Sequence, residues 1–182
     1  MFFLNFFFVK KTKPKKKNQY PHQAHASLAA SAPVRAIVSF YQFDELVAHA
    51  AGEACARGIR HATEVVEKAA RQNLTATASD FGCAATADAT DFLYVLADVV
   101  AFGIQMDSKY HFQGEMCQNF TTFPSKFAYE VYRQYTSFLF GFTNTTCSDW
   151  MLTSFNNTKP TPTDYMRPWL WQTCTELGYF QV

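Results

Sequence analysis

The chain has 182 residues, of which 48% are hydrophobic and 17% aromatic, and this composition indicates a buried globular core rather than a disordered chain. Its net charge of +1 comes from sixteen basic and fifteen acidic residues, but six of the lysines lie between Lys10 and Lys17. Without residues 1–19 the count is ten basic against fifteen acidic, a net of −5. This mildly acidic body argues against nucleic acid as a partner.

Residues 1–19 differ from the rest of the sequence. They begin with the apolar run MFFLNFFFV and continue with the basic run KKTKPKKKNQ. A secretory signal has its positive charge before the apolar stretch, so this order does not predict a signal peptide. Nine apolar residues are also too few for a helix that spans a bilayer. Membrane-surface contact through residues 1–17 and a nuclear-localisation patch are alternatives, but we interpret the segment as unrelated to the rest of the chain.

The next part of the chain predicts one strand and then helices. Ala26–Ala32 is a run of small residues that stops at Pro33, which is typical of a buried parallel strand. Phe40–Ala50 fits both a helical period and an alternating one, and Gly52 interrupts either. Arg57–Arg71 has apolar residues at three- and four-residue spacing with charges opposite, which predicts an amphipathic helix.

The strongest helical signal covers Asp91–Met106, after a predicted loop over Gln72–Thr90. Its apolar residues form two adjacent stripes, Phe92, Val95, Val99, Phe102 and Met106 in one and Leu93, Leu96, Val100 and Ile104 in the other. A helix with two apolar faces is covered on most sides, and sixteen residues are too few to span a membrane. We therefore expect a core helix of a helical domain.

The remaining elements are less regular. Asp107–Phe123 is predicted as a loop, and a helix follows from Pro124 or Ser125 to Gly141. The predicted buried face of this helix consists of Phe127, Val131, Tyr135 and Phe138. Thr143–Arg167 is rich in Thr, Asn and Pro and predicts a surface loop. Trp169–Trp171 is apolar and strand-prone, so we expect a strand there.

Cysteines and glycosylation sequons point to the secretory pathway. The five cysteines are disulfide candidates without C-x-x-C spacing, which argues against a zinc or thioredoxin-like site: Cys55, Cys83, Cys117, Cys147 and Cys174. Sequons for N-glycosylation occur at Asn73, Asn119, Asn144 and Asn156, where chance predicts roughly one. Proteins of the secretory pathway form disulfides, and the odd count leaves at least one cysteine without a partner in the chain.

Four stretches carry a resemblance to a known family. They are Tyr20–His22 (YPH), Ala29–Val34 (AASAPV), Asp91–Gln105, and Gln172–Glu176 (QTCTE) with Trp169 before it and GYFQ after it. In this order they resemble the serine peptidases that include lysosomal Pro-X carboxypeptidase, dipeptidyl peptidase II and thymus-specific serine protease. The resemblance extends from about Tyr20 to the last residue. It implies an α/β-hydrolase interrupted by a helical cap, a secreted or lysosomal location, and a homodimer.

This resemblance divides the chain into four expected segments. Residues 1–19 are the unrelated N-terminal segment, and residues 20–38 hold a strand of the hydrolase body. Residues 39–166 are the helical cap, and residues 167–182 return to the hydrolase body. We therefore expect an α/β-hydrolase fragment, namely a mostly α-helical cap domain flanked by one or two strands of the hydrolase sheet.

The catalytic groups of a serine hydrolase are absent from the sequence. Hydrolases of this fold place the nucleophile in G-x-S-x-G, and no two of the seven glycines are four residues apart. In the resembled family the acid and the histidine follow the QTCTE segment, and no Asp or His follows Glu176. Ser31 has no neighbouring glycine and is interpreted as a strand residue. His22 and His25 lack a third ligand nearby, so we expect no metal and no cofactor.

Substrate contact is a separate question from catalysis. Trp169 and Trp171 are our candidates for the aromatic wall of a pocket that binds proline, with core packing as the alternative. Leu170 stands where a dipeptidyl peptidase would place an acid for the substrate amine, which favours the carboxypeptidase side. We therefore expect a Pro-X-carboxypeptidase-like serine exopeptidase acting on peptides, in which this chain alone is inactive. The alternative is a non-catalytic secreted glycoprotein or interaction module derived from the cap.

Overall fold

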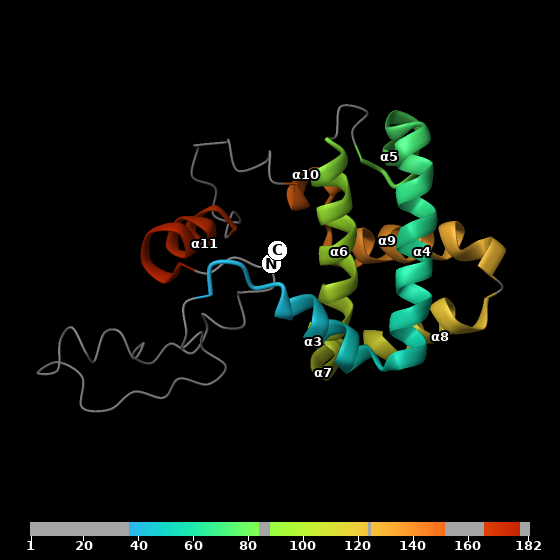
Figure 1. Ribbon diagram of the computed structural model, residues 1–182, viewed down its shortest axis with the longest axis horizontal. Coiled ribbons are helices and arrows are strands. Elements are labelled where there is room, and N and C mark those ends of the chain that lie inside the picture. Colours follow the sequence, from blue (N-terminus) through green and yellow to red (C-terminus); the bar gives the residue numbers. More distant parts are fainter. Residues whose placement is uncertain (1–36, 84–87, 124, 152–165, 179–182) are drawn as a thin grey trace, which may run out of the picture. The chain divides into compact units, whose positions relative to one another are not determined.

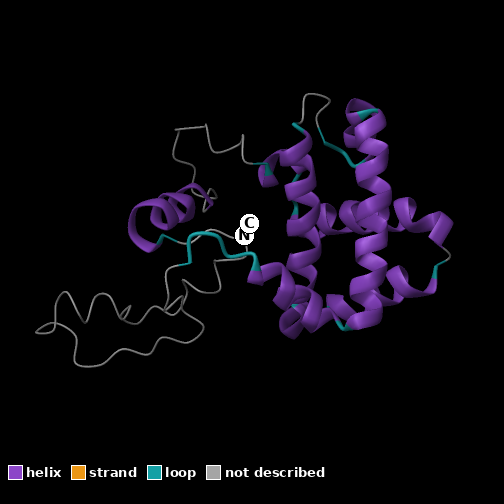
Figure 2. Ribbon diagram, in the orientation of Figure 1, coloured by secondary structure: helices purple, strands orange, loops and turns teal. Residues whose placement is uncertain are grey.

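The computed structural model describes residues 37–83, 88–123, 125–151 and 166–178, and within these ranges every regular element is a helix (Figure 2). The chain divides into two compact units. Tyr41–Thr158 forms one, here called the helical unit. Met1–Phe40 and Lys159–Val182 form the other, here called the terminal unit. Within the described ranges no helix is both long enough and apolar enough to span a bilayer.

The helical unit contains most of the described residues (Figure 1). Its elements are α3 (Gln42–Ala51), α4 (Glu53–Gln72), α5 (Leu74–Asp80), α6 (Ala89–Gln105), α7 (Asp107–Tyr110), α8 (Phe112–Thr122), the 3-10 turn η1 (Ser125–Phe127), α9 (Ala128–Thr143) and α10 (Cys147–Trp150). The long helix α4 packs against α3, α5, α8 and α9, while α6 packs against α3 and α8. The core therefore lies between α4, α6, α8 and α9.

The helices with the clearest sequence period are confirmed. Asp88 begins α6, because its carboxylate accepts hydrogen bonds from the backbone N–H groups of Thr90 and Asp91. One predicted stripe of α6 is buried throughout, and Leu96 and Val100 of the second stripe are buried as well. The ambiguous segment before Gly52 is the helix α3. Gly52 has φ of 82°, which is costly for any residue with a side chain, and it separates α3 from α4.

Two predicted loops contain helices. The loop predicted over Gln72–Thr90 contains α5, which starts where the Asn73 side chain accepts a hydrogen bond from the Ala76 N–H at 3.0 Å. The loop predicted over Asp107–Phe123 contains α7 and α8. The buried residues of α8 are Phe112, Met116 and Phe120, which are spaced by four, and this helical period spans too few residues to stand out in the sequence.

Helix α9 exists as predicted, but its buried face and its end differ. Phe127 and Phe138 are 44% and 46% exposed. The buried side chains are Val131, Tyr132, Tyr135, Thr136, Leu139 and Phe140. The helix continues past Gly141 and ends at Asn144, which has φ of 51°. The predicted loop over Thr143–Arg167 begins with α10, and its residues 152–165 lie outside the described ranges.

The predicted strand at Trp169–Trp171 is wrong. These residues lie in α11 (Met166–Gln172), which continues as the π-helical turn η3 (Thr173–Leu177) in the terminal unit. Pro168 lies in the first turn, where a missing N–H removes no helical hydrogen bond. Gly178, with φ of 54°, ends the turn and donates its N–H to the Thr173 carbonyl at 2.9 Å. The strand predicted over Ala26–Ala32 lies outside the described residues.

Two disulfides connect distant parts of the helical unit. Cys55 of α4 is bonded to Cys117 of α8, and Cys83, after α5, is bonded to Cys147 of α10. The bonded residues are 62 and 64 positions apart in the sequence. Cross-links that close loops of this length restrict the unfolded chain, which stabilises the fold by about 4 kcal/mol each in the chain-entropy account. Cys174 is free and exposed.

Candidate functional site

No hydrolytic or metal centre is present among the described residues. They contain no group of three or more His, Cys, Asp or Glu side chains that could hold a metal ion. The described histidines are His49, His61 and His111, and each is exposed on a different part of the helical unit. A general base in a serine peptidase lies within hydrogen-bond reach of the serine and is oriented by a third group. These histidines have neither property. The other residues considered from the sequence, His22, His25 and Ser31, lie outside the described ranges.

The two predicted substrate-binding tryptophans have different environments. Trp169 is 8% exposed and Trp171 is 60% exposed. Residues two apart on a helix point in nearly opposite directions, so α11 does not bring both indole rings to one face. The burial of Trp169 fits the alternative of core packing, and substrate contact by either tryptophan stays a prediction. Trp171 is the candidate that keeps its ring available to a ligand.

A perturbed carboxyl group lies on α6. Burial raises the pKa of Asp98 from 3.8 to about 6, a hydrogen bond from Tyr94 opposes that change, and the charge of Asp44 on α3 adds to it. The pKa of the Tyr94 phenol is raised in turn, by burial and then by Asp98. Perturbed carboxyls of this kind concentrate at functional sites. The sequence analysis did not single out Asp98, although an acid in the middle of the apolar helix α6 was a usable signal.

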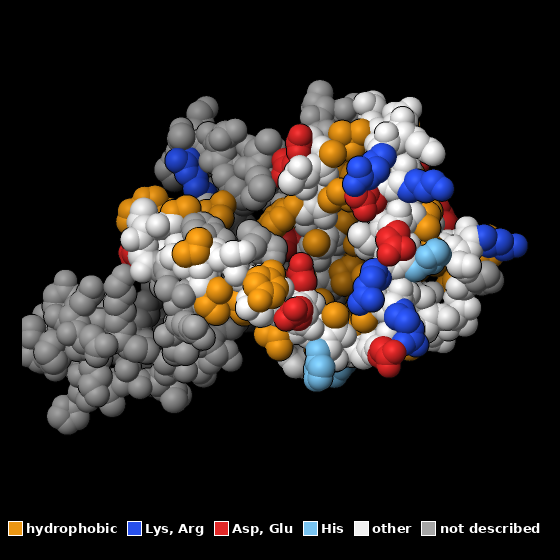
Figure 3. All heavy atoms as spheres, in the orientation of Figure 1, with side chains coloured by type: hydrophobic (Ala, Val, Ile, Leu, Met, Phe, Trp, Pro, Cys, Tyr) orange, Lys and Arg blue, Asp and Glu red, His pale blue; other side chains and the backbone are white. Residues whose placement is uncertain are grey.

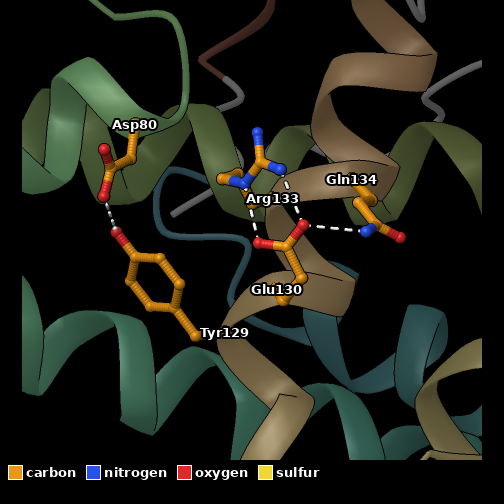
Figure 4. Close-up of polar contacts among 5 residues, drawn as sticks. All are labelled: Asp80, Tyr129, Glu130, Arg133 and Gln134. Carbon is orange, nitrogen blue, oxygen red and sulfur yellow. Dashed lines mark hydrogen bonds and ion pairs between the residues drawn. The ribbon is translucent and has the colours of Figure 1, made fainter.

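A second polar cluster joins α5 to α9 (Figure 4). The Tyr129 hydroxyl donates a hydrogen bond to Asp80 at 2.9 Å, and burial together with Asp80 raises the pKa of Tyr129 to about 12. The Glu130 carboxylate accepts two hydrogen bonds from Arg133, at 2.9 and 2.6 Å, and one from Gln134 at 2.7 Å. These bonds lower the pKa of Glu130 to about 2. The printed polar contacts of this cluster join side chains of the protein itself, so we assign the cluster a structural role.

One face of the helical unit carries charges of both signs (Figure 3). Acidic and basic side chains alternate over the face that Figure 3 shows, with no large area of one sign. Nucleic-acid-binding surfaces gather basic residues on one face. This face has the character of a solvated protein surface.

The sequons of the described part of the chain lie in three settings. Asn73 is exposed and caps α5 with its side-chain oxygen. Asn119 is half-buried within α8. Asn144 is exposed at the end of α9. Asn156 lies outside the described residues.

These features define a mostly helical domain that is cross-linked by two disulfides. The profile of the family named Serine carboxypeptidase S28 matches residues 14–182, and the chain belongs to this family of serine peptidases.

The chain is similar to a curated plant protein, the "Probable serine protease EDA2" of Arabidopsis thaliana. The two are 31% identical over 170 residues, which cover 90% of this chain and 33% of the relative. The chain therefore spans about a third of the relative's length. No solved structure matches the chain.

Proposed function

We propose that this chain forms the cap of a serine exopeptidase of the Pro-X carboxypeptidase kind and does not hydrolyse peptides by itself. The observation that carries the proposal is the helical unit, whose described residues pack a core without any serine–histidine arrangement. Membership in the S28 family supports the peptidase class. The sequence supports inactivity, since it contains no G-x-S-x-G. A serine hydroxyl without a base stays protonated and is a poor nucleophile.

The peptide substrate, and a second copy of the chain as a partner, follow from the resemblance to the family rather than from any contact. Two disulfides and four sequons favour the secretory pathway as the compartment in which the helical unit folds. Within this proposal Trp171 is the residue that contacts an apolar side chain of the peptide, because its ring is exposed.

A hydrolysis assay tests the proposal. The purified full chain is incubated with peptides that end in Pro-X, and the products are separated by mass, with an active serine exopeptidase as the positive control. We expect no release of the C-terminal residue above the buffer control. Release that disappears when one serine of this chain is replaced by alanine contradicts the proposal.

Asp98 favours a second specificity, the release of N-terminal dipeptides. Burial disfavours the ionised form of Asp98. A neighbouring cation stabilises this form, and the free amino group of a peptide is such a cation. Titration of the chain with peptides whose amino terminus is free or acetylated discriminates between dipeptide release and carboxypeptidase specificity. Preference for the free amine that is lost in Asp98→Asn supports dipeptide release. Equal binding of both peptides supports carboxypeptidase specificity.

The alternative of a non-catalytic interaction module has one observation in its favour. Both disulfides and the described core lie within the helical unit, so this unit has what an independently folding domain needs. Cooperative unfolding of the secreted chain, together with retention of a specific partner by wild type but not by a surface variant, supports this alternative. Aggregation of the isolated chain counts against it.

A further inference from the structure

An aromatic patch lies where α9 ends beside α7 and α8. It consists of Tyr110, Phe112, Phe138 and Phe142. The ring of Phe112 lies 4.8 Å from Phe142 and 5.9 Å from Phe138, and Tyr110 lies 5.1 Å from Phe142. Phe112 is buried, but Tyr110, Phe138 and Phe142 are 36%, 46% and 47% exposed. A continuous exposed aromatic surface of this kind marks a place that something else covers.

A sequon lies at the end of α9, close in sequence to Phe142 of this patch. Asn144 follows Phe142 by two residues and starts the sequence Asn144-Thr145-Thr146. It adopts the left-handed conformation, with φ of 51°, and is exposed. The backbone N–H groups of Asn144 and Thr145 donate hydrogen bonds to carbonyls of the last helical turn. The Asn144 side chain is therefore not needed to cap the end of α9. The Asn144 amide makes no hydrogen bond to another described residue.

The other described sequons are less suited to modification. The side-chain oxygen of Asn73 accepts the capping hydrogen bond from the Ala76 N–H. Asn119 is half-buried in the middle of α8, and the hydroxyl of its sequon residue Thr121 donates to the Cys117 carbonyl at 2.7 Å. Asn144 is therefore the described sequon that is exposed, lies outside a helix and has an uncommitted side chain.

We propose that Asn144 carries an N-linked glycan and that its first N-acetylglucosamine packs on the ring of Phe142, covering the aromatic patch. The linkage joins Nδ2 of Asn144 to C1 of the sugar. The C1–phosphate bond of a lipid-linked oligosaccharide donor breaks, the lipid diphosphate leaves, and the amide loses one proton. One face of the sugar ring presents C–H groups, which are attracted to the negative face of an aromatic ring and are apolar enough to gain from burial.

Mass spectrometry tests the site. The full chain is secreted from eukaryotic cells behind a cleavable signal peptide, and its intact mass is compared with that of variants. Asn144→Asp keeps the shape of the side chain and removes the acceptor, so we expect the loss of one glycan. Asn119→Asp is the matched control and keeps the full glycan mass. An unmodified Asn144 in the secreted wild type overturns the proposal.

Thermal unfolding tests the packing of the sugar on Phe142. The secreted chain, trimmed by an endoglycosidase to one sugar, is compared with the unglycosylated chain from a bacterial periplasm, in which Asn144 stays an uncharged amide. We expect the single-sugar form to have a melting temperature about 2–4 °C above that of the sugar-free form. A stabilisation near 1 kcal/mol from stacking shifts the melting temperature by this amount in a domain of this size. Phe142→Leu abolishes the difference, whereas Phe142→Tyr, and Phe127→Leu at another exposed phenylalanine, retain it. An unchanged difference in Phe142→Leu overturns the stacking.

Discussion

The crossing of α4 over α8 provides a test of the packing at the centre of the helical unit. A Cβ atom on Gly58 would lie 2.3 Å from the Phe120 carbonyl oxygen and 3.2 Å from its Cβ. Cys55 lies one turn before Gly58, and its disulfide to Cys117 holds the two helices together at the same crossing. The helices therefore cannot move apart freely to admit a methyl group.

The expected effects of two glycine substitutions have opposite signs. In a helix interior, alanine is favoured over glycine by about 1 kcal/mol. In Gly58→Ala the overlap with backbone exceeds this gain, since overpacking costs roughly 1–3 kcal/mol and occasionally more. We expect a net loss of up to about 2 kcal/mol. Gly114 of α8 has no atom within 4 Å of its Cβ position, so Gly114→Ala stabilises by roughly 0.5–1 kcal/mol.

Urea unfolding followed by circular dichroism, with the disulfides intact, measures both free energies. The reasoning is refuted if Gly58→Ala is as stable as Gly114→Ala, because the close approach of α4 and α8 would then be absent. Gly141→Ala in α9 is a second control without contacts within 4 Å. It tests whether the gain at Gly114 reflects helix propensity alone.

Three further predictions concern a core residue, a hydrogen bond and a pH effect. Leu96 is fully buried on α6, so Leu96→Ala lowers the free energy of unfolding by about 2–5 kcal/mol and Leu96→Asp leaves no cooperative transition in the same urea assay. Tyr129→Phe removes the hydrogen bond to Asp80 and lowers the free energy of unfolding by about 1 kcal/mol. An unchanged urea midpoint would contradict a stabilising role of this hydrogen bond. The folded-state pKa of Asp98 lies above 3.8, so its ionisation weakens the fold as the pH rises from about 4 to about 6. Asp98→Asn therefore raises the free energy of unfolding at pH 7 by about 1–2 kcal/mol. This gain is smaller than the full pKa shift would give, because the side chain is half-buried and solvent screens its charge. An equal gain at pH 4 would show that the ionisation of Asp98 is not the cause.

The sequence predicted the long helices because their signal is spread over many residues. In α6 two apolar stripes agree, and burial follows the first throughout and the second at Leu96 and Val100. The shorter α5 and α8 were missed, since their limits depend on the Asn73 cap and on the packing of Phe112 and Phe120 against distant helices. The face of α9 was misassigned because Phe138 is the more hydrophobic choice, whereas the core instead contains Thr136, whose hydroxyl is satisfied by the Tyr132 carbonyl.

The candidate site was less predictable than the fold. Strand propensity of tryptophan misplaced Trp169 and Trp171, which the good helix formers around them hold in α11. Asp98 was overlooked because the stripes of α6 were judged by their apolar members. The cysteine pairing could not be deduced from spacing, since the bonded partners are brought together only by the crossing of α4 with α8 and the placement of α10.

Labelling with a fluorophosphonate probe tests the central claim most directly, because the probe reacts only with a serine that a base has activated. We predict no labelling of the purified full chain under conditions in which an active serine peptidase is labelled completely. Stoichiometric labelling of this chain at one of its own serines, lost when that serine is replaced by alanine, would contradict the account.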